Sequence, residues 1–352
     1  MIKYLRLLLL PFSLIYAGIT ILRNKLYDLG VFRSRSFDIP VICVGNLVVG
    51  GSGKSPVTEY LIGLFPDLRI AVLSRGYGRD TTGFIRANEN STARSVGDEP
   101  LQFYRKFPQV TVAVCEDRVF GIDQLKSDHD LIILDDAFQH RRVKAGFNIL
   151  LFEYQKLLEP QFVLPAGNMR EVFSGYQRAD LLMVTKSPVI ANEGQKQQLA
   201  EKFDEAARDK VFFSSIQYGN LTGLITQQLL NWELLGTQTV FLLTGIANPD
   251  PLLDHIKGYG PPVIHHNYPD HHVFSFQNIS KLVKAFKAHP AKEKIILTTE
   301  KDAQRLIDIT IKELLLDLPV FYLPIRILIE EKSKNKFDQK ILDYVSNTAR
   351  NR

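Results

Sequence analysis

A glycine-rich segment near residue 50 carries residue types that bind nucleotide phosphates. In IPVICVGNLVVGGSGKSP an apolar run precedes the glycines, and residues 53–55 (GKS) precede a helix-like stretch. In such loops backbone N–H groups surround a phosphate, the lysine contacts the β and γ phosphates, and the serine ligates Mg²⁺. The consensus asks for glycine at position 48, which is valine here, so the later glycines supply the flexibility. The predicted nucleotide-binding residues are Val48, Val49, Gly50, Gly51, Ser52, Gly53, Lys54 and Ser55.

Two adjacent aspartates predict a Mg²⁺ site beside the phosphate loop. In DLIILDDAFQH an apolar run ends at Asp135 and Asp136. A carboxylate at that position lies beside the P-loop serine and holds Mg²⁺ directly or through water. Paired acids at a strand end also occur as helix caps. With the P-loop upstream, we predict that Asp135 and Ser55 bind Mg²⁺.

The segment LLMVTKSPVI bears on the choice of base. Guanine-specific P-loop proteins use an Asn/Thr-Lys-x-Asp segment after a strand. Thr185 and Lys186 fit that pattern, but Pro188 occupies the place of the guanine-reading carboxylate. The sequence therefore favours ATP over GTP.

Four further loops carry charged candidates for phosphoryl transfer. A kinase needs a carboxylate or histidine near the incoming hydroxyl, and cations near the transferring group. Most of these loops follow predicted strands, where open α/β sheets keep their binding crevice, so they can converge on one site. Taken singly, such charges are typical of solvated loops. The candidates, in SVGDEP, LSRGYGR, VAVCEDR and LPAGNMRE, are Asp98, Glu99, Arg75, Arg118, Arg170 and Glu171.

Two polar segments stand out in the second half of the chain. NYPDHHVF contains His271, with no neighbouring spacing that favours zinc. Either this histidine closes over the first domain to assist a carboxylate, or it forms hydrogen bonds within its own loop. In LTTEKDAQRL, residues 299–302 either cap a helix or face a cleft between domains.

The order of apolar runs predicts an α/β fold with two domains. A chain of 352 residues is too long for one ordinary domain. Short Val-, Ile- and Leu-rich runs separated by helix-length segments indicate parallel strands covered on both faces. A polar helix is expected over 191–210, with the domain boundary between 190 and 215 and a closing helix in the charged tail. The predicted strands are 40–44, 70–73, 110–114, 131–134, 149–152, 181–184, 211–216, 240–243, 295–298 and 320–323.

The N-terminal region predicts association with a membrane. Residues 7–22 are nearly uncharged and are flanked by Lys3, Arg6, Arg23 and Lys25. The run is short for a spanning helix and contains Pro11, and it lacks the small residues of a signal cleavage site. We therefore predict a helix in the membrane interface, held by its basic flanks. The alternative is a helix packed on the protein's own core.

Composition excludes several other classes of protein. With 45% apolar and 23% charged residues the chain is neither disordered nor a polytopic membrane protein. A net charge of +5 is too small to imply nucleic acid but fits an anionic lipid or phosphorylated ligand. Two cysteines exclude a disulfide framework.

Read in order, the motifs GNLVVGGSGKSP, LSRGYGR, GDEP, DDAFQH, LPAGNMRE, VTK, TGIANP, PDHH and TTEKDAQRL resemble the tetraacyldisaccharide 4'-kinase family of lipid A synthesis. The resemblance implies transfer of the ATP γ-phosphate to the 4'-hydroxyl of an acylated glucosamine disaccharide 1-phosphate, with Mg²⁺. It implies a peripheral protein on the cytoplasmic face of the bacterial inner membrane, with no nucleic acid and no obligate protein partner. It also implies two α/β/α domains joined by a short β linker.

Residue roles follow from the same resemblance. Asp98 corresponds to the catalytic base, and His271 to its assisting residue. Lys54 and Ser55 match residues that contact the phosphates and Mg²⁺ in the family. Charged residues that line the family's site correspond to Glu99, Asp135, Asp136, Arg170 and Glu171. Glu99 is taken as a third metal ligand. The expected parts are a membrane-associated helix (1–30), a P-loop kinase domain (31–212), a smaller α/β domain (213–330) and a C-terminal helix (331–352). The alternatives are a membrane-associated P-loop ATPase or nucleotide switch acting on a protein partner, and a lipid-binding protein with a vestigial loop.

Overall fold

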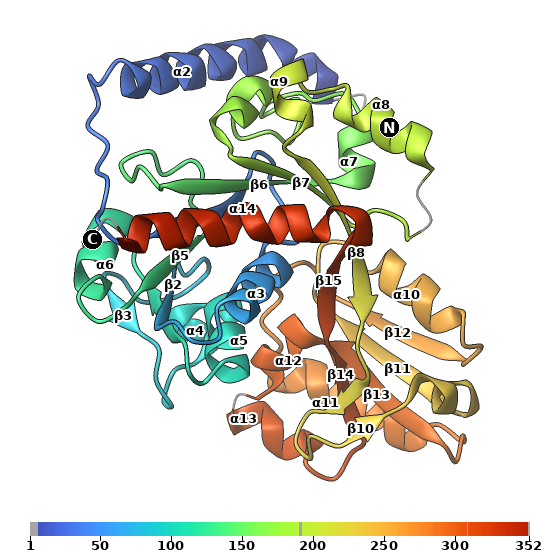
Figure 1. The fold of residues 1–352 in the computed structure, drawn as a ribbon. Helices are drawn as coiled ribbons and strands as arrows, with labels where there is room; N and C mark the ends of the chain where they lie inside the picture. Colours follow the sequence, from blue (N-terminus) through green and yellow to red (C-terminus); the bar gives the residue numbers. More distant parts are fainter. Residues whose placement is uncertain (1–5, 190–191, 308, 351–352) are drawn as a thin grey trace.

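A largely parallel sheet of nine strands forms the centre of the larger domain. The computed structural model describes residues 6–189, 192–307 and 309–350 (Figure 1). The strand order is β15-β8-β7-β6-β1-β5-β2-β4-β3, and only the pairs β3–β4 and β8–β15 are antiparallel. The strands are β1 (Val41–Asn46), β2 (Ile70–Ser74), β3 (Ile85–Arg86), β4 (Thr111–Val114), β5 (Leu131–Asp135), β6 (Phe147–Glu153), β7 (Leu181–Thr185), β8 (Val211–Tyr218) and β15 (Ile325–Ile329).

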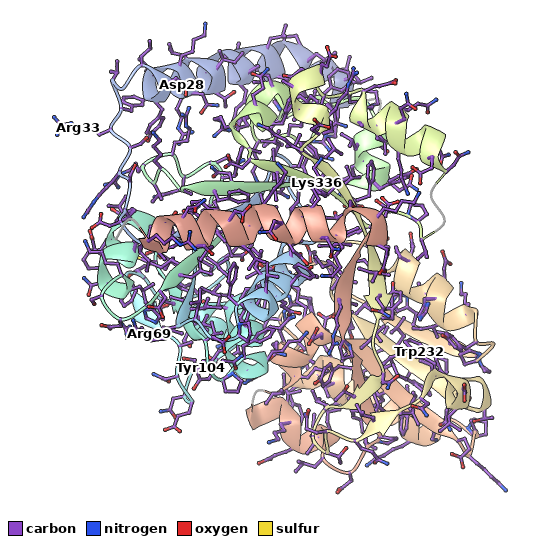
Figure 2. All side chains as sticks on the ribbon, in the orientation of Figure 1. Asp28, Arg33, Arg69, Tyr104, Trp232 and Lys336 are labelled. Carbon is purple, nitrogen blue, oxygen red and sulfur yellow. The ribbon has the colours of Figure 1, made fainter. Side chains whose placement is uncertain are left out.

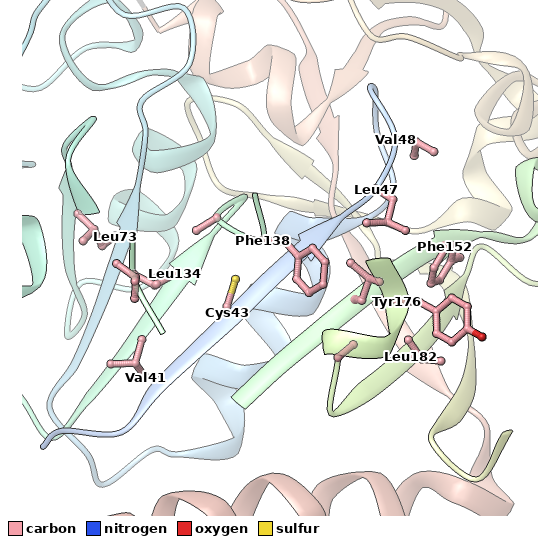
Figure 3. Close-up of a cluster of buried hydrophobic side chains, with 14 of the residues drawn as sticks. Val41, Cys43, Leu47, Val48, Leu73, Leu134, Phe138, Phe152, Tyr176 and Leu182 are labelled. Carbon is pink, nitrogen blue, oxygen red and sulfur yellow. The ribbon is translucent and has the colours of Figure 1, made fainter. Parts of the chain in front are cut away.

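Both faces of this sheet are covered, which explains its continuous apolar strands. On β1, Val41 and Cys43 join the core of one face (Figure 3), whereas Ile42 and Val44 join the other. Helices α6, α7, α8 and η2 pack on the first face, and α3, α5 and α14 on the second. The helices of this domain are α3 (Lys54–Leu64), α4 (Ala93–Val96), α5 (Asp98–Lys106), α6 (Arg118–Leu125), α7 (Tyr154–Leu158), η2 (Phe173–Arg178), α8 (Glu193–Ala200), α9 (Glu205–Arg208) and α14 (Glu331–Arg350).

A second sheet of six strands forms the smaller domain, in the order β10-β9-β14-β13-β11-β12. Helices α11 and α12 cover one face, and α10 and η3 the other. Trp232, at the start of η3, marks this domain in Figure 2. The elements are β9 (Leu221–Gly223), β10 (Leu229–Leu230), η3 (Trp232–Thr237), β11 (Thr239–Thr244), α10 (Asp250–Lys257), β12 (Val263–Asn267), α11 (Phe276–Ala288), β13 (Lys294–Thr299), α12 (Glu300–Leu306), α13 (Ile309–Lys312), η4 (Glu313–Leu315) and β14 (Val320–Leu323).

The α/β prediction is confirmed, and each predicted strand lies within two residues of an observed one. The single helix expected over 191–210 is wrong: the segment forms two short helices, and residue 191 lies outside the described residues. Phe203 turns into the core between them, and Asp204 caps the second helix. The prediction also omitted β3, β9, β10, β12 and β15. β3, β9 and β10 have only two or three residues, β12 (VIHHN) is partly polar, and β15 (IRILI) follows β14 after a single proline.

Two antiparallel strands, β8 and β15, join the domains. Both belong to the nine-stranded sheet, and in Figure 1 β8 runs toward the smaller domain whereas β15 runs back from it to α14. The chain therefore leaves this sheet after Tyr218 and returns to it at Ile325. The limits 212 and 330 stay proposals for the domains. Helix α14 returns to the larger domain and buries Phe337, Ile341 and Val345 there, as the closing helix of the prediction requires.

The N-terminal helix presents its polar side to the protein and its apolar side outward. It comprises η1 (Arg6–Leu9) and α2 (Leu10–Asp28). Ser13 is 3% exposed and donates to the Val163 carbonyl, whereas Leu14 is 73% exposed. Among the described helices this one is long and apolar enough to cross a membrane by length and composition, and only 6% of its apolar window is buried. The alternative of a helix packed on its own core is therefore wrong.

The chain leaves α2 through an exposed segment before entering the first sheet. Figure 2 shows Asp28 at the end of the helix and Arg33 in this segment. Asp28 pairs with Arg141 at 2.6 Å, and Arg141 also lies over the ring of Tyr27. These contacts fix the end of α2 close to the loop that follows β5. Lys3 lies outside the described residues.

Candidate active site

The predicted P-loop lies between β1 and α3, as the motif requires. Gly50 and Gly53 have φ of 98° and 84°, a left-handed conformation that glycine adopts without strain. Helix α3 begins directly after Gly53, so Lys54 and the hydroxyl of Ser55 lie in its first turn. This helix terminus adds unpaired N–H groups and positive potential, which suit an anion.

Neighbouring strand ends hold the loop in this shape. The Asn46 side chain donates to the Ser52 hydroxyl at 2.7 Å. Thr185 Oγ1 donates to the Ser52 carbonyl at 2.8 Å, and Lys186 Nζ to the Gly51 carbonyl at 2.6 Å. Thr185 and Lys186, which the sequence analysis compared with a guanine-recognition segment, therefore support the backbone of the phosphate loop.

The first part of the loop contacts the 163–171 segment. Val48 is buried and forms a β-bridge with Met169. Val49 N–H donates to the Asn168 carbonyl at 2.9 Å. This segment also receives hydrogen bonds from Arg6, Ser13 and Tyr16 of the N-terminal helix. The phosphate loop and the N-terminal helix thus share one supporting loop.

An acidic cluster of Asp135 and Asp136, of which Asp135 is buried, lies beside Lys54. Asp136 Oδ1 is 3.7 Å from Lys54 Nζ. Arg170 donates two hydrogen bonds to the same carboxylate, at 2.9 and 3.3 Å. Asp135 is 1% exposed, and its Oδ1 has no hydrogen-bond partner among the described residues. Burial and the nearby charges of Glu99 and Asp136 raise the pKa of Asp135, against the opposing effect of Lys54. An anion left in this condition is stabilised by a bound cation.

These residues fit Mg²⁺ in the presence of a nucleotide. Mg²⁺ takes one or two carboxylates together with waters and phosphate oxygens, rather than an all-protein cage. Asp135 and Ser55 provide the required oxygens, and the charge of Glu99 raises the pKa of Asp135. No group of three or more His, Cys, Asp or Glu side chains that could hold a metal occurs in the described part of the chain. The arrangement is therefore suited to metal held jointly with a triphosphate.

Two further cations border the acidic cluster. Arg118 is 2% exposed, donates to the Cys115 carbonyl at 2.8 Å, and acts electrostatically on Asp135 and Asp136. Its burial and the positive charge of Arg75 lower the pKa of Arg118. Arg75 is exposed in the loop after β2.

Asp98 and His271 meet across the domain interface. Asp98 is the first residue of α5 and is 7% exposed, and its Oδ2 lies 3.2 Å from His271 Nδ1. Arg305 of α12 contacts the same oxygen, and Lys301 Nζ lies 3.1 Å from His271 Nε2. Burial alone would raise the pKa of Asp98. The His271 hydrogen bond and the charges of Lys301 and Arg305 outweigh it and hold that pKa well below its usual range.

Glu99 connects this pair to the acidic cluster. Its carboxylate accepts from Lys301 Nζ at 3.2 Å and also raises the pKa of Asp135. Glu99 and Lys301 therefore link the base candidate to the metal candidates, and Lys54 of the phosphate loop lies beside Asp136. Backbone strain is concentrated there as well: among the described non-glycine residues with positive φ are Asp136, Lys186 and His271, at 50°, 55° and 57°.

Comparison with known proteins decides the family. The family model described as tetraacyldisaccharide-1-P 4'-kinase matches residues 5–345. The chain belongs to this family. A tetraacyldisaccharide 4'-kinase of Flavobacterium psychrophilum is 44% identical over 355 residues, covering 99% of both chains. One from Bacteroides thetaiotaomicron is 42% identical over 357 residues, covering 97% of this chain and 94% of the relative.

A solved member of the family has the same fold. LpxK from Aquifex aeolicus, crystallised in complex with ATP, superposes with a TM-score of 0.75 at 31% identity, covering 97% of this chain and 99% of that one. The resemblance read from the motifs and the assignment as a kinase family member are therefore confirmed.

Glu171, a site residue predicted from the resemblance, has three hydrogen-bond partners among the described residues. Glu171 is 3% exposed, and its carboxylate accepts from Asn24 at 2.8 Å, Gln139 at 3.0 Å and Arg178. Its partners lie on α2, in the loop after β5 and in η2, and Gln139 also accepts from Arg170 at 3.4 Å. Glu171 thus connects the N-terminal helix with the loop that carries Arg170.

Two residues that contact Asp98, His271 or Glu99 received no catalytic role in the sequence analysis. Lys301 and Arg305 both lie on α12, within the segment TTEKDAQRL. Their spacing of four residues, with Asp302 three before Arg305, places the three polar side chains on one helical face. Both alternatives left open for this segment hold, because Thr299 caps α12 and the helix also faces Asp98 and Glu99.

Proposed function

We propose that this protein transfers the γ-phosphate of ATP to the 4'-hydroxyl of an acylated glucosamine disaccharide 1-phosphate. Membership of the kinase family supports the reaction class. The single observation that carries the assignment is the 3.2 Å contact between the buried Asp98 carboxylate and His271. Lys301 and Glu99 link this contact to Asp135. A hydrolase needs only a positioned water, whereas a sugar hydroxyl benefits from a carboxylate that accepts its proton.

The chain's own residues divide the work of the reaction. Asp98 accepts the proton of the 4'-hydroxyl, whose oxygen forms a bond to the γ-phosphorus while the bond to the β–γ bridging oxygen breaks and ADP leaves. Asp98 Oδ1 is the suitable atom, since its partner is the Glu99 N–H at 3.2 Å, whereas Oδ2 is held by His271 and Arg305. Lys54 and the N–H groups at the start of α3 stabilise the negative charge on the phosphates.

We propose Ser55 and Asp135 as ligands of Mg²⁺, with Glu99 beside them. Held by these residues together with the nucleotide, Mg²⁺ would neutralise negative charge that develops on the phosphates during transfer. Asp136 does not need to ligate directly, because Lys54 and Arg170 already hold its carboxylate. The remaining cations, Arg75 and Arg118, would add positive potential at the same end of the sheet.

We propose a peripheral location on the cytoplasmic face of the bacterial inner membrane. Exposed Leu8, Leu14 and Leu22 support contact of the N-terminal helix with acyl chains, and Arg23 and Lys25 lie near its end. ATP is available on the cytoplasmic side. Shared support by the 163–171 segment would place the lipid surface close to the phosphate loop.

Product mapping tests this proposal. Purified protein is incubated with ATP labelled in the γ-phosphate, Mg²⁺ and the disaccharide 1-phosphate lipid in mixed micelles, and the product is mapped by ³¹P NMR. We expect one new monoester at the 4' position and loss of transfer on chelation of Mg²⁺. Label released only as inorganic phosphate, or attached at another hydroxyl, would contradict the proposal.

A further inference from the structure

Helix α12 brings a polar network of the smaller domain against the base candidate. Asp302 is fully buried and accepts from the Gly245 N–H at 3.0 Å and from Thr299 Oγ1 at 2.7 Å. Arg305 is 9% exposed, and its Nη1 donates to Asp302 at 2.8 Å and to the Gly245 carbonyl at 3.2 Å. Its Nη2 contacts Asp98 of the larger domain. One guanidinium therefore joins both domains at the site.

The same network holds the backbone of His271. The His271 N–H donates to the Gly245 carbonyl at 3.1 Å, the oxygen that Arg305 also contacts. His271 has φ of 57°, a conformation that costs a non-glycine residue energy and persists only where surrounding contacts impose it. Arg305 thus contacts Asp98 directly and the His271 turn through Gly245.

Lys301 determines how His271 contacts Asp98. An ammonium group can only donate, so His271 Nε2, 3.1 Å from Lys301 Nζ, must accept. The ring proton then lies on Nδ1, which donates to Asp98 Oδ2 at 3.2 Å. Lys301 is held in place by Glu99 at 3.2 Å. A neutral histidine oriented in this way fixes the carboxylate that it contacts.

We propose that Arg305 is a positioning residue for phosphoryl transfer, which holds Asp98 of one domain and the Gly245–His271 turn of the other in one geometry, and that Lys301 selects the ring nitrogen of His271 that donates to Asp98. This inference rests on the proposed function. Arginine suits the role because its planar fork reaches two partners at once, which lysine cannot do. In the described part of the chain Arg305 makes no hydrogen bond to the phosphate loop, whereas Lys301 contacts Glu99 beside the proposed metal ligands.

A second contact between α5 and α12 provides a matched control. Arg105 Nη1 donates to Gln304 at 2.9 Å, an exposed bond between the same two helices. If α12 only fastened the domains together, loss of this bond and loss of Arg305 would differ only in degree. If Arg305 positions the reacting groups, only its loss should change the chemical step.

The test compares Arg305→Gln, Arg305→Lys and Arg105→Gln in the full-length protein. For each, kcat and KM are measured with ATP and the disaccharide lipid, alongside the Kd for ATP and the thermal unfolding midpoint. Misplacement of a reacting group costs up to about 100-fold, so we expect Arg305→Gln to lower kcat by about 10- to 100-fold with KM and Kd changed by less than about twofold. Arg305→Lys should fall between Arg305→Gln and the unmodified enzyme, and Arg105→Gln should change kcat by less than about twofold.

Several results would overturn the inference. These are an Arg305→Gln kcat within twofold of the unmodified enzyme, a rise in KM alone, an equal loss in Arg105→Gln, or an Arg305→Lys variant less active than Arg305→Gln. If Arg305→Gln fails to fold, Arg305→Lys is compared with Arg105→Gln instead. We then expect Arg305→Lys to have a lower kcat than the unmodified enzyme and an unchanged KM. In an Asp98→Ala background, Arg305→Gln should cause no further loss, and a further loss would show that it does not act through Asp98.

The contribution of Lys301 has its own spectroscopic readout. In protein with ¹⁵N-labelled histidine, the His271 signal, assigned with His271→Gln, should show the proton on Nδ1. Lys301→Met should shift the signal toward the other tautomer, and a proton on Nε2 in the unmodified protein would overturn this part. If the unmodified protein does not phosphorylate the lipid, the proposed function is wrong. If it is active and the Arg305 variants have the same kcat, only this inference is wrong.

Discussion

The two halves of the site are built in opposite ways. The nucleotide half comes from one continuous segment, β1, the loop and the start of α3, with short-range support from Asn46. The acceptor half joins Asp98 to His271 and Arg305, which lie 173 and 207 residues further along the chain. The first half lies within a single domain, where Thr185 and Lys186 also support the loop. The second exists only where two domains meet, so changes at the interface should affect transfer more than nucleotide binding.

The sharpest way to break this comparison is Asp98→Ala. Loss of a general base lowers kcat by about 10²- to 10⁴-fold, and we expect a loss within that range. The phosphate loop contains no contact to Asp98, so the Kd for ATP, measured by calorimetry, should change by less than about twofold. Transfer within about threefold of the unmodified enzyme would show that another group accepts the proton.

The reciprocal change is Lys54→Ala, which removes a cation from the nucleotide half. Because Lys54 faces both the phosphates and Asp136, both the affinity for ATP and kcat should fall, the latter by about 10²- to 10³-fold. Calorimetry and the transfer assay measure the two effects. Unaltered ATP binding by this variant would mean that the loop does not hold the triphosphate.

A smaller effect is expected from the outward face of the N-terminal helix. Burial of a leucine contributes about 1.5–3 kcal/mol, so the pair Leu14→Glu and Leu22→Glu should weaken binding to anionic vesicles by about 100-fold or more. Vesicle sedimentation measures this binding. Leu234→Glu, on the exposed surface of the smaller domain, is the control and should bind as the unmodified protein does. Equal sedimentation of all three proteins would refute a membrane role for α2.

The smallest expected effect concerns the support of the phosphate loop. Thr185→Val removes the hydrogen bond to the Ser52 carbonyl, worth about 1 kcal/mol, and should weaken ATP binding by about fivefold. Thr185→Ser keeps the hydroxyl and serves as the matched control. If both variants bind ATP equally, the hydroxyl does not hold the loop.

The difference between the halves also explains what the sequence could reveal. Buried parallel strands leave continuous apolar runs, and the glycine-rich loop has a fixed spacing, so the sheet and Lys54 were predictable. Membrane association was predicted from an apolar run whose polar residues, such as Ser13 and Asn24, turn out to face the protein. Arg305 has no motif of its own, and its role depends on a contact between domains. Glu171 was placed with the site by resemblance, and this role stays a prediction; its partners include Asn24 of α2 and Gln139, which also contacts Arg170.

The most direct test of a transferase built from two halves is the dependence of ADP release on the acceptor. ADP formation is measured with ATP and Mg²⁺, with and without the disaccharide 1-phosphate lipid, together with the yield of 4'-phosphate. We expect ADP release to rise by at least about 100-fold with the lipid and to match the 4'-phosphate formed one to one. ADP release at the same rate without the acceptor, or without formation of the 4'-phosphate, would show an ATPase and contradict the assignment of Asp98 and His271 to an acceptor site.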